Sequence, residues 1–160
     1  MLRPITPELR PVVERLWQLY RHDLSEFRGS LPAADGLFPL RLLLPYLDDP
    51  DRRTYLIEDG GPPLGFAFVS RLAEGPLLMS EFFVVRAARR TGVGRAAALE
   101  VLGCHPGRWE IPFQEENPGA ARFWRGVAAA VAGDTWSEER RPVPGKPHIP
   151  DDVWITLDAP

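Results

Sequence analysis

Residues 84–95 read Val84-Val85-Arg86-Ala87-Ala88-Arg89-Arg90-Thr91-Gly92-Val93-Gly94-Arg95, and this segment is the most informative one for the fold. The almost uninterrupted apolar run 77–85 predicts a buried strand, and the alanine-rich segment after Arg95 predicts a helix. Between them, glycines let backbone N–H groups approach a ligand without an intervening Cβ, and the helix N-terminus adds unpaired donors and partial positive charge. The stretch therefore predicts a cradle for a pyrophosphate, while an ordinary strand-to-helix turn remains the simpler alternative.

Two widespread phosphate-binding patterns do not fit this turn. The dinucleotide-binding fingerprint requires a third glycine where Ala97 stands, and the P-loop requires a Gly-Lys-Ser/Thr sequence, whereas the single lysine is Lys146. Three arginines nevertheless fall within the turn, which concentrates positive charge there in a chain of net charge −3. These are Arg89, Arg90 and Arg95.

Helical and strand patterns alternate on both sides of the turn. Thr6 and Pro7 favour a helix start, Pro11 obscures its first residue, and apolar spacing carries this helix to about Glu26. The other expected helices are 40–47, 96–102 and 117–131, and the expected strands are 1–5, 53–58, 64–72, 77–85, 108–113, 136–140 and 153–157. This order predicts one α/β domain over residues 1–160, with a mixed central sheet of about six to seven strands flanked by about four helices.

Composition excludes several classes of protein. The 160 residues include 22 acidic and 19 basic side chains, too few cations for a protein that coats nucleic acid. One cysteine excludes a disulfide framework, and three separated histidines give no metal-ligand spacing, so no metal is expected. Without an apolar run of membrane-spanning length or a signal peptide, we expect a soluble cytoplasmic protein with neither nucleic acid nor membrane as partner.

Two motifs at a characteristic separation resemble those of the GNAT superfamily of N-acetyltransferases. Arg89-x-x-Gly92-x-Gly94 matches the signature Arg/Gln-x-x-Gly-x-Gly/Ala, and residues 117–124 resemble a second motif, Asn-x-x-Ala-x-x-Phe-Tyr. The order of expected elements is similar over essentially the whole chain. The resemblance implies a GNAT-like sheet that opens between two central parallel strands to bind acetyl-CoA, with no metal.

The resemblance also implies which residues hold acetyl-CoA. Strand 77–85 would pair with the pantetheine arm, the 90–95 backbone would hold the pyrophosphate, and Asn117 would contact the cofactor unless it is only a helix N-cap. The residues assigned to the cofactor in this way are Phe82, Phe83, Val84, Arg89, Arg90, Thr91, Gly92, Val93, Gly94, Arg95, Asn117 and Phe123.

Two carboxylates are candidates for the catalytic base. Glu81 lies within an apolar run, where an unpaired acid is costly or has a raised pKa, unless it points into a solvated gap or pairs with an arginine. Glu110, on the strand 108–113, is the alternative. The proton donor stays open, because Trp124 occupies the usual tyrosine position and an indole does not exchange its proton near neutral pH. No pattern selects a replacement among the tyrosines, which are Tyr20, Tyr46 and Tyr55.

The resemblance implies an N-acetyltransferase in which a primary amine attacks acetyl-CoA directly. Segments 28–46 and 142–150 and the strand with Glu81 are expected to form the acceptor site. The acceptor is expected to be a small-molecule or peptide amine, and the acids Asp23, Glu26 and Asp35 are compatible with a cationic one. A homodimer is left open. The alternative is a non-catalytic module that binds or senses acyl-CoA, favoured by Trp124.

Overall fold

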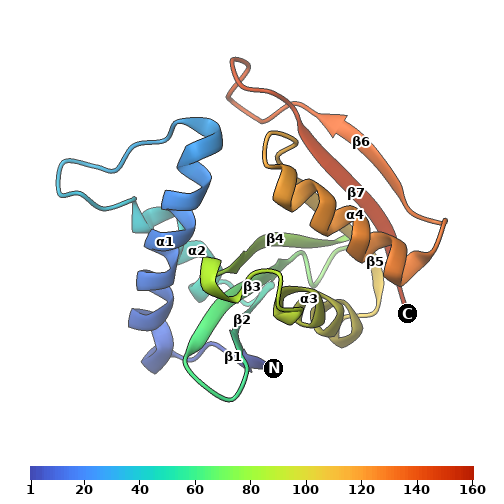
Figure 1. The fold of residues 1–160 in the computed structure, drawn as a ribbon, viewed down its shortest axis with the longest axis horizontal. Coiled ribbons are helices and arrows are strands. Elements are labelled where there is room, and N and C mark those ends of the chain that lie inside the picture. Colours follow the sequence, from blue (N-terminus) through green and yellow to red (C-terminus); the bar gives the residue numbers. More distant parts are fainter.

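A single seven-stranded sheet organises the chain in a computed structural model that describes all residues from Met1 to Pro160 (Figure 1). The strand order is β1-β2-β3-β4-β5-β7-β6. The strands are β1 (Leu2–Pro4), β2 (Arg52–Glu58), β3 (Pro63–Ser70), β4 (Leu77–Val84), β5 (Gly107–Phe113), β6 (Ser137–Arg141) and β7 (Asp152–Ala159). The helices are α1 (Arg10–Arg28), α2 (Leu44–Asp48), α3 (Val93–Cys104) and α4 (Pro118–Ala132), with short 3-10 turns η1 (Pro7–Leu9), η2 (Leu40–Leu42) and η3 (Arg86–Ala88). This confirms the predicted fold class.

The sheet has one pair of parallel strands, β4 and β5, which lies at its centre and is hydrogen-bonded over only a short stretch. β4 and β5 are matched only at Leu77 with Trp109 and at Leu78 with Glu110, near the start of each strand. All other neighbouring strands are antiparallel. Beyond Leu78 the two central strands diverge, so the sheet opens at its middle.

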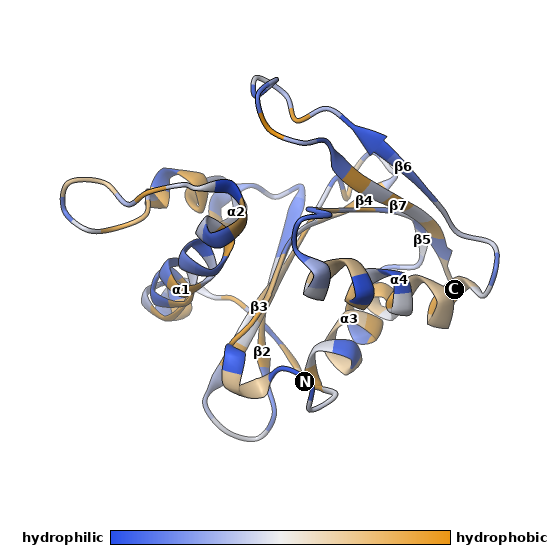
Figure 2. Ribbon diagram, turned by 45° about the horizontal axis from the view of Figure 1, so that its top comes forward, coloured by the Kyte–Doolittle hydropathy of each residue, from blue (hydrophilic) through white to orange (hydrophobic).

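Helices cover both faces of the sheet (Figures 1 and 2). On one face Val13, Leu16 and Trp17 of α1 pack against phenylalanines of β3 and β4. On the other face α3 and α4 pack against β5 and β7, in a larger cluster that contains Trp109 and Trp124. The helix residues buried in these two clusters are apolar. Burial of apolar surface therefore fixes α1 and α4 on opposite sides of the opening.

A β-bulge in β4 determines which way its side chains point. Phe68 of β3 is paired with Glu81, but the next residue, Val69, is paired with Met79, so Ser80 is an extra residue. Met79 packs into the cluster beneath α3 and α4, whereas Ser80 and Glu81 both face the α1 side, where they bond Ser70 and Tyr20. Without the bulge, strand alternation would place Met79 and Glu81 on the same face.

The predicted elements are present, with shifts at prolines. α1 begins at Arg10 after η1, so Pro11 falls in its first turn, where a missing N–H costs no hydrogen bond, and Thr6 makes no capping bond. The expected helix 40–47 is divided into η2 and α2, with Pro45 in the first turn of α2. No helix is both long and apolar enough to cross a membrane.

Candidate active site

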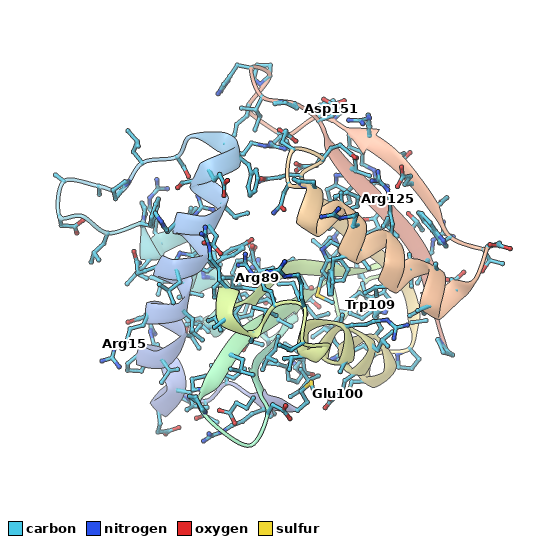
Figure 3. The ribbon with its side chains drawn as sticks, in the orientation of Figure 1. Arg15, Arg89, Glu100, Trp109, Arg125 and Asp151 are labelled. Carbon is cyan, nitrogen blue, oxygen red and sulfur yellow. The ribbon has the colours of Figure 1, made fainter.

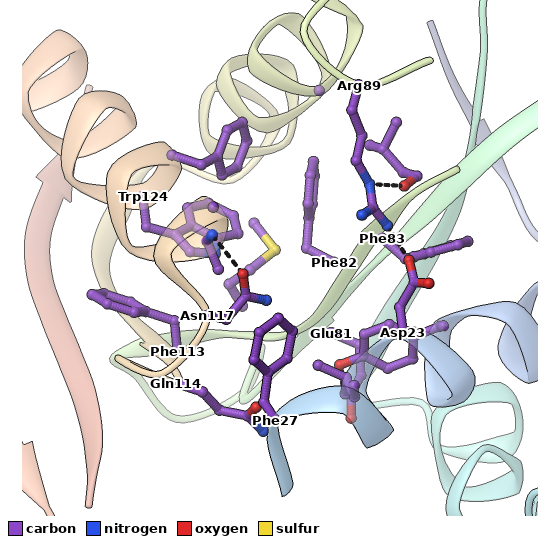
Figure 4. A pocket seen from close by; sticks show the side chains of 18 of the residues that line it. Asp23, Phe27, Glu81, Phe82, Phe83, Arg89, Phe113, Gln114, Asn117 and Trp124 are labelled. Atoms are coloured by element: carbon purple, nitrogen blue, oxygen red, sulfur yellow. Dashed lines mark hydrogen bonds and ion pairs between the residues drawn. The ribbon is translucent and has the colours of Figure 1, made fainter. Parts of the chain in front are cut away.

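The opening between β4 and β5 is the mouth of a cavity of about 1130 Å³ (Figure 4). Its walls are α1, the C-terminal half of β4, the turn that follows β4, the end of β5, and the first turns of α4. Asp152 of β7 completes the wall. A volume of this size is at the upper end of what ligand sites in proteins usually have. One long ligand therefore fits between the two halves of the sheet.

At one end of the cavity the turn before α3 presents its backbone amides. Arg90 and Gly92 have left-handed φ values of 64° and 97°, and α3 begins directly afterwards without a side-chain cap. The first N–H of this segment with a backbone acceptor is that of Ala96, which donates to the carbonyl of Gly92. The six successive N–H groups of residues 90–95 thus have no acceptor within the protein. Such a run of donors at a helix N-terminus is an anion-binding geometry.

Arginine side chains surround these amides, and they divide into two groups. Arg86 and Arg89 both pair with Asp23 of α1, and the Nε of Arg89 donates to the carbonyl of Val84 at 2.8 Å. Figure 3 shows Arg89 between α1 and the rest of the molecule, and Figure 4 shows it reaching toward Asp23. The arginines with no acidic partner, exposed along the cavity wall, are Arg90, Arg95 and Arg122.

The backbone of β4 offers hydrogen-bonding groups to the opening, at alternate residues. The N–H of Val85 donates to Leu64 of β3, and a Cβ on Gly65 would come within 1.9 Å of the carbonyl oxygen of Phe83. Successive residues in a strand direct their N–H and C=O groups to opposite edges. The N–H and C=O groups of Phe83 therefore face β3, while those of Phe82 and Val84 face the opening. The carbonyl of Val84 already accepts from Arg89, so the peptide groups placed to pair with a ligand are those of Phe82 and the N–H of Val84, and Phe83 offers none.

Glu81 lies further along β4, between two tyrosines. Tyr20 of α1 donates a short hydrogen bond to one carboxylate oxygen, and Tyr46 of α2 donates to the other at 3.0 Å. Burial raises the pKa of Glu81, although both hydrogen bonds and the charge of Arg21 oppose the rise. Burial and the adjacent carboxylate also raise the pKa of both tyrosines, so their protons stay on oxygen. Glu81 and Tyr20 line the cavity.

Glu110, the other expected candidate, has a different environment. It lies on β5 outside the cavity wall, paired with Arg71 at 2.5 Å and with Arg141 at 2.8 Å. Burial raises its pKa, but the hydrogen bonds and charges of the two arginines outweigh burial and hold the pKa below its ordinary value. An ionised carboxylate engaged by two guanidinium groups is a weak base, so we assign Glu110 no catalytic role.

The residues of the second motif form the α4 wall. The side chain of Asn117 accepts from the N–H of Ala120 at 3.1 Å, which is helix capping, and Asn117 also lines the cavity. Phe123 stacks on Phe82 with ring centroids 5.5 Å apart, and Trp124 meets Phe82 edge-on at 5.1 Å. Figure 4 shows Trp124 on the α4 side of the pocket, across from Glu81. Thr91 and Val93 do not line the cavity; their side chains point elsewhere, and only their N–H groups belong to the turn.

Solved structures match this arrangement, whereas no family model and no curated protein matches the sequence. An acetyltransferase from Thermus thermophilus superposes with a TM-score of 0.70 at 20% identity, covering 99% of this chain and 96% of that one. Spermidine N-acetyltransferase from Vibrio cholerae, solved with CoA and spermine, gives 0.70 at 12% identity, with 99% and 95% covered. A GNAT-family acetyltransferase from Staphylococcus aureus gives 0.66 at 13% identity, with 99% and 98% covered.

The chain has the GNAT fold. Each of the three matches spans nearly all of both molecules, and the sheet opens at its single parallel pair, as the motif resemblance implies. At such low identity the similarity establishes the architecture. Chemistry must be argued from the residues of this chain.

Within this GNAT fold, the far end of the cavity differs from the sequence expectation. Residues of α1 between Tyr20 and Phe27 form that wall, and neither of the expected segments, 28–46 and 142–150, contributes to it. The side chain of Asp35 accepts a hydrogen bond from the backbone N–H of Leu37, and Asp35 does not line the cavity. Two of the acids expected near the acceptor, Asp23 and Glu26, do line this wall. The segments were misplaced because the apolar spacing of α1 shows which side packs on the sheet but not where the sheet opens.

The tyrosine pair around Glu81 was also not selected from the sequence. Tyr20 belongs to the apolar period of α1 that places Val13 and Trp17 against the sheet, and this spacing was the available signal. Tyr46 carried no such signal, since α2 has only five residues. No three His, Cys, Asp or Glu side chains gather where they would hold a metal ion.

Proposed function

We propose that this protein is an N-acetyltransferase that transfers the acetyl group of acetyl-CoA to a primary amine by direct attack. The observation that carries the proposal is one cavity with free backbone amides of residues 90–95 at one end and the partly buried carboxylate of Glu81 further along β4. The first feature suits a pyrophosphate, and the second suits removal of a proton from an amine.

The donor end of the cavity fits acetyl-CoA. The six unpaired N–H groups and the cations Arg90, Arg95 and Arg122 would hold the phosphates. The peptide group of Phe82 and the N–H of Val84 would pair with the pantetheine arm. The Vibrio cholerae neighbour, whose structure contains CoA, supports this assignment. Acetyl-CoA supplies an activated acyl group as a thioester, and an N–H of β4 near Val84 would polarise its carbonyl.

Glu81 and Tyr20 together would remove the proton of the attacking amine. An alkyl ammonium group has a pKa of about 10, so the amine must lose a proton before or during attack. Both carboxylate oxygens of Glu81 already accept hydroxyl groups, and of the two tyrosines only Tyr20 lines the cavity. In this proposal the amine passes its proton to the oxygen of Tyr20 while the hydroxyl proton of Tyr20 moves to Glu81. The raised pKa of Glu81 favours this transfer.

The acceptor is proposed to be a small-molecule amine. The spermidine N-acetyltransferase from Vibrio cholerae was solved with spermine, an amine of this kind. In the present chain the far end of the cavity, bounded by Phe27, Gln114 and Asp152, would admit the acceptor opposite the donor.

A second function is favoured by one residue. Trp124 is 5% exposed and packs edge-on against Phe82, at the motif position where the GNAT resemblance expects a tyrosine. An indole cannot protonate a departing thiolate. A protein that binds acyl-CoA without turnover would lose nothing by this change, whereas in an enzyme the thiolate would leave unaided or take its proton from another group.

Binding and turnover, measured in sequence, distinguish the two functions. The melting temperature is measured with and without CoA and acetyl-CoA, and release of free thiol is then followed over a panel of primary amines. Stabilisation by both cofactors with amine-dependent thiol release supports the enzyme. Stabilisation with no thiol release on any amine supports the binding module, and no stabilisation by either cofactor contradicts both.

A further inference from the structure

The acids that face the cavity from α1 and β7 are already neutralised. Asp23 pairs with Arg86 at 2.8 Å and also with Arg89, and Asp152 pairs with Arg28 at 2.8 Å. Glu26, the remaining acid of the α1 wall, lies 4.0 Å from Arg86. These acids therefore offer little uncompensated negative charge to a cationic acceptor.

Arg21 is the exception among the charged groups of this wall. It lines the cavity from α1, and no carboxylate lies within ion-pair distance of its guanidinium. Its Nε is buried without any hydrogen-bond partner. Buried polar groups in proteins are nearly always hydrogen-bonded, and a charged one left without a partner is costly. Arg21 therefore lines the cavity as a cation whose charge no protein carboxylate neutralises within ion-pair distance and whose Nε has no protein acceptor.

The position of Arg21 separates it from the arginines of the donor end. Arg90 and Arg95 follow β4, next to the free amides, whereas Arg21 follows Tyr20 on α1 and its guanidinium lies 5.9 Å from the centre of the Trp17 ring. The charge of Arg21 lowers the pKa of Glu81, Tyr20 and Tyr46, which places it in the same part of the cavity as that group. An aromatic face beneath a guanidinium restricts its movement and leaves its N–H groups available to a ligand.

We propose that Arg21 binds a carboxylate of the acceptor, so that the acceptor is an amino acid or a similar molecule carrying both an amine and a carboxylate. This rests on the proposed acetyl transfer, because it assumes that the amine lies at Tyr20 and Glu81. The planar fork of a guanidinium matches a carboxylate with two parallel hydrogen bonds. A single unpaired arginine near an acid is a poorer site for a doubly charged phosphate, and a polyamine would bring only further positive charge to it.

Matched acceptors that differ only in the anionic group test the proposal. Phenylalanine is compared with phenethylamine, and β-alanine with ethanolamine and O-phosphoethanolamine, by kcat/KM for thiol release. The increase in melting temperature that the same compounds cause in the CoA-saturated protein measures their binding independently of turnover. We expect the carboxylate-bearing member of each set to be favoured about ten- to a hundredfold, the range of a charged hydrogen-bonded contact.

Variants then assign the preference to Arg21. In Arg21→Gln the preference is expected to fall to near unity, and Arg21→Lys should retain part of it, because charge remains without the fork. Arg15→Gln, an exposed arginine on α1 outside the cavity, is the matched control and should keep the wild-type preference. The melting temperature of each variant checks that it folds, and the wild-type comparison stands on its own if one does not.

Several results would overturn the proposal. These are equal use of amines with and without a carboxylate, a preference for the phosphate compound, a preference that survives in Arg21→Gln, or loss of CoA stabilisation in that variant, which would assign Arg21 to the donor. Failure of the proposed function looks different, since then no amine of any class releases thiol.

Discussion

Glu81 combines a chemical role with a cost in stability, and both are measurable in one variant. Because burial raises its pKa above the ordinary 4.5, the folded protein favours the protonated form. The contribution of Glu81 to stability is therefore fully present below its unfolded-state pKa, and it is lost as pH rises through the higher pKa of the folded state. Glutamine keeps the shape and stays neutral at every pH.

Glu81→Gln is thus predicted to be more stable than the wild type at neutral pH, with the two converging as pH falls toward 4.5. Urea unfolding at several pH values measures this. Acetyl transfer in the same variant should fall about a hundredfold or more, the usual contribution of a general base, while CoA still stabilises it. A variant that is less stable than the wild type at neutral pH, or equally active, would contradict the role given to Glu81.

The two tyrosines beside Glu81 are predicted to differ in function although both donate to it. Removing either hydroxyl deletes a hydrogen bond that lowers the pKa of Glu81, so Tyr20→Phe and Tyr46→Phe should both move the acidic limb of kcat/KM to higher pH. Only Tyr20 lines the cavity, so only Tyr20→Phe should also lower the plateau rate, by about tenfold or more. Equal plateau rates in the two variants would rule out transfer through Tyr20.

At the scale of elements, the turn between β4 and α3 was the part most accessible from sequence. Gly92 and the arginines around it mark a strand, a turn and a helix, because glycine and helix-start signals act over a few residues. The β-bulge at Ser80 was not predictable in this way. It arises from how β4 registers against β3, and it decides that Glu81 faces α1 rather than the α4 side.

The same turn gives a prediction about charge. Arg95 has no acidic partner and lines the donor end, so Arg95→Gln should weaken CoA binding by about tenfold, or roughly 1.4 kcal/mol, and reduce the sensitivity of binding to salt. Arg15, on the outer side of α1 in Figure 3, is the matched control, and Arg15→Gln should bind CoA like the wild type. Titration calorimetry at two salt concentrations measures the CoA affinity of both variants. An equal loss of affinity in Arg95→Gln and Arg15→Gln would mean that only the net charge of the protein matters.

At the scale of the whole molecule, one arginine links the two halves of the sheet across the far end of the cavity. Arg28 at the end of α1 pairs with Glu116 before α4 at 3.1 Å and with Asp152 of β7 at 2.8 Å. These partners lie 88 and 124 residues away in sequence, so no local sequence pattern could predict the contact.

Arg28→Met is predicted to cost about 1–3 kcal/mol of unfolding free energy at neutral pH, because two partly buried carboxylates lose their cation. The loss of unfolding free energy should become smaller as pH falls, because the two acids become protonated. Burial raises the pKa of Asp152, so this acid takes up its proton at a higher pH than an ordinary aspartate. Urea unfolding measures it, with Arg3→Met as control, since the Arg3–Glu58 pair is long at 3.5 Å and exposed. A pH-independent loss would point to packing instead of charge.

Direct transfer from bound acetyl-CoA to an amine is tested most simply by following thiol release in rapid mixing, with and without the amine. With acetyl-CoA alone we predict no release of thiol, and on adding an accepted amine a steady release with no initial burst, because no acetyl group rests on the protein. A burst of thiol before the amine is added, in proportion to the protein present, would reveal a covalent acetyl-enzyme and contradict direct attack at Glu81 and Tyr20.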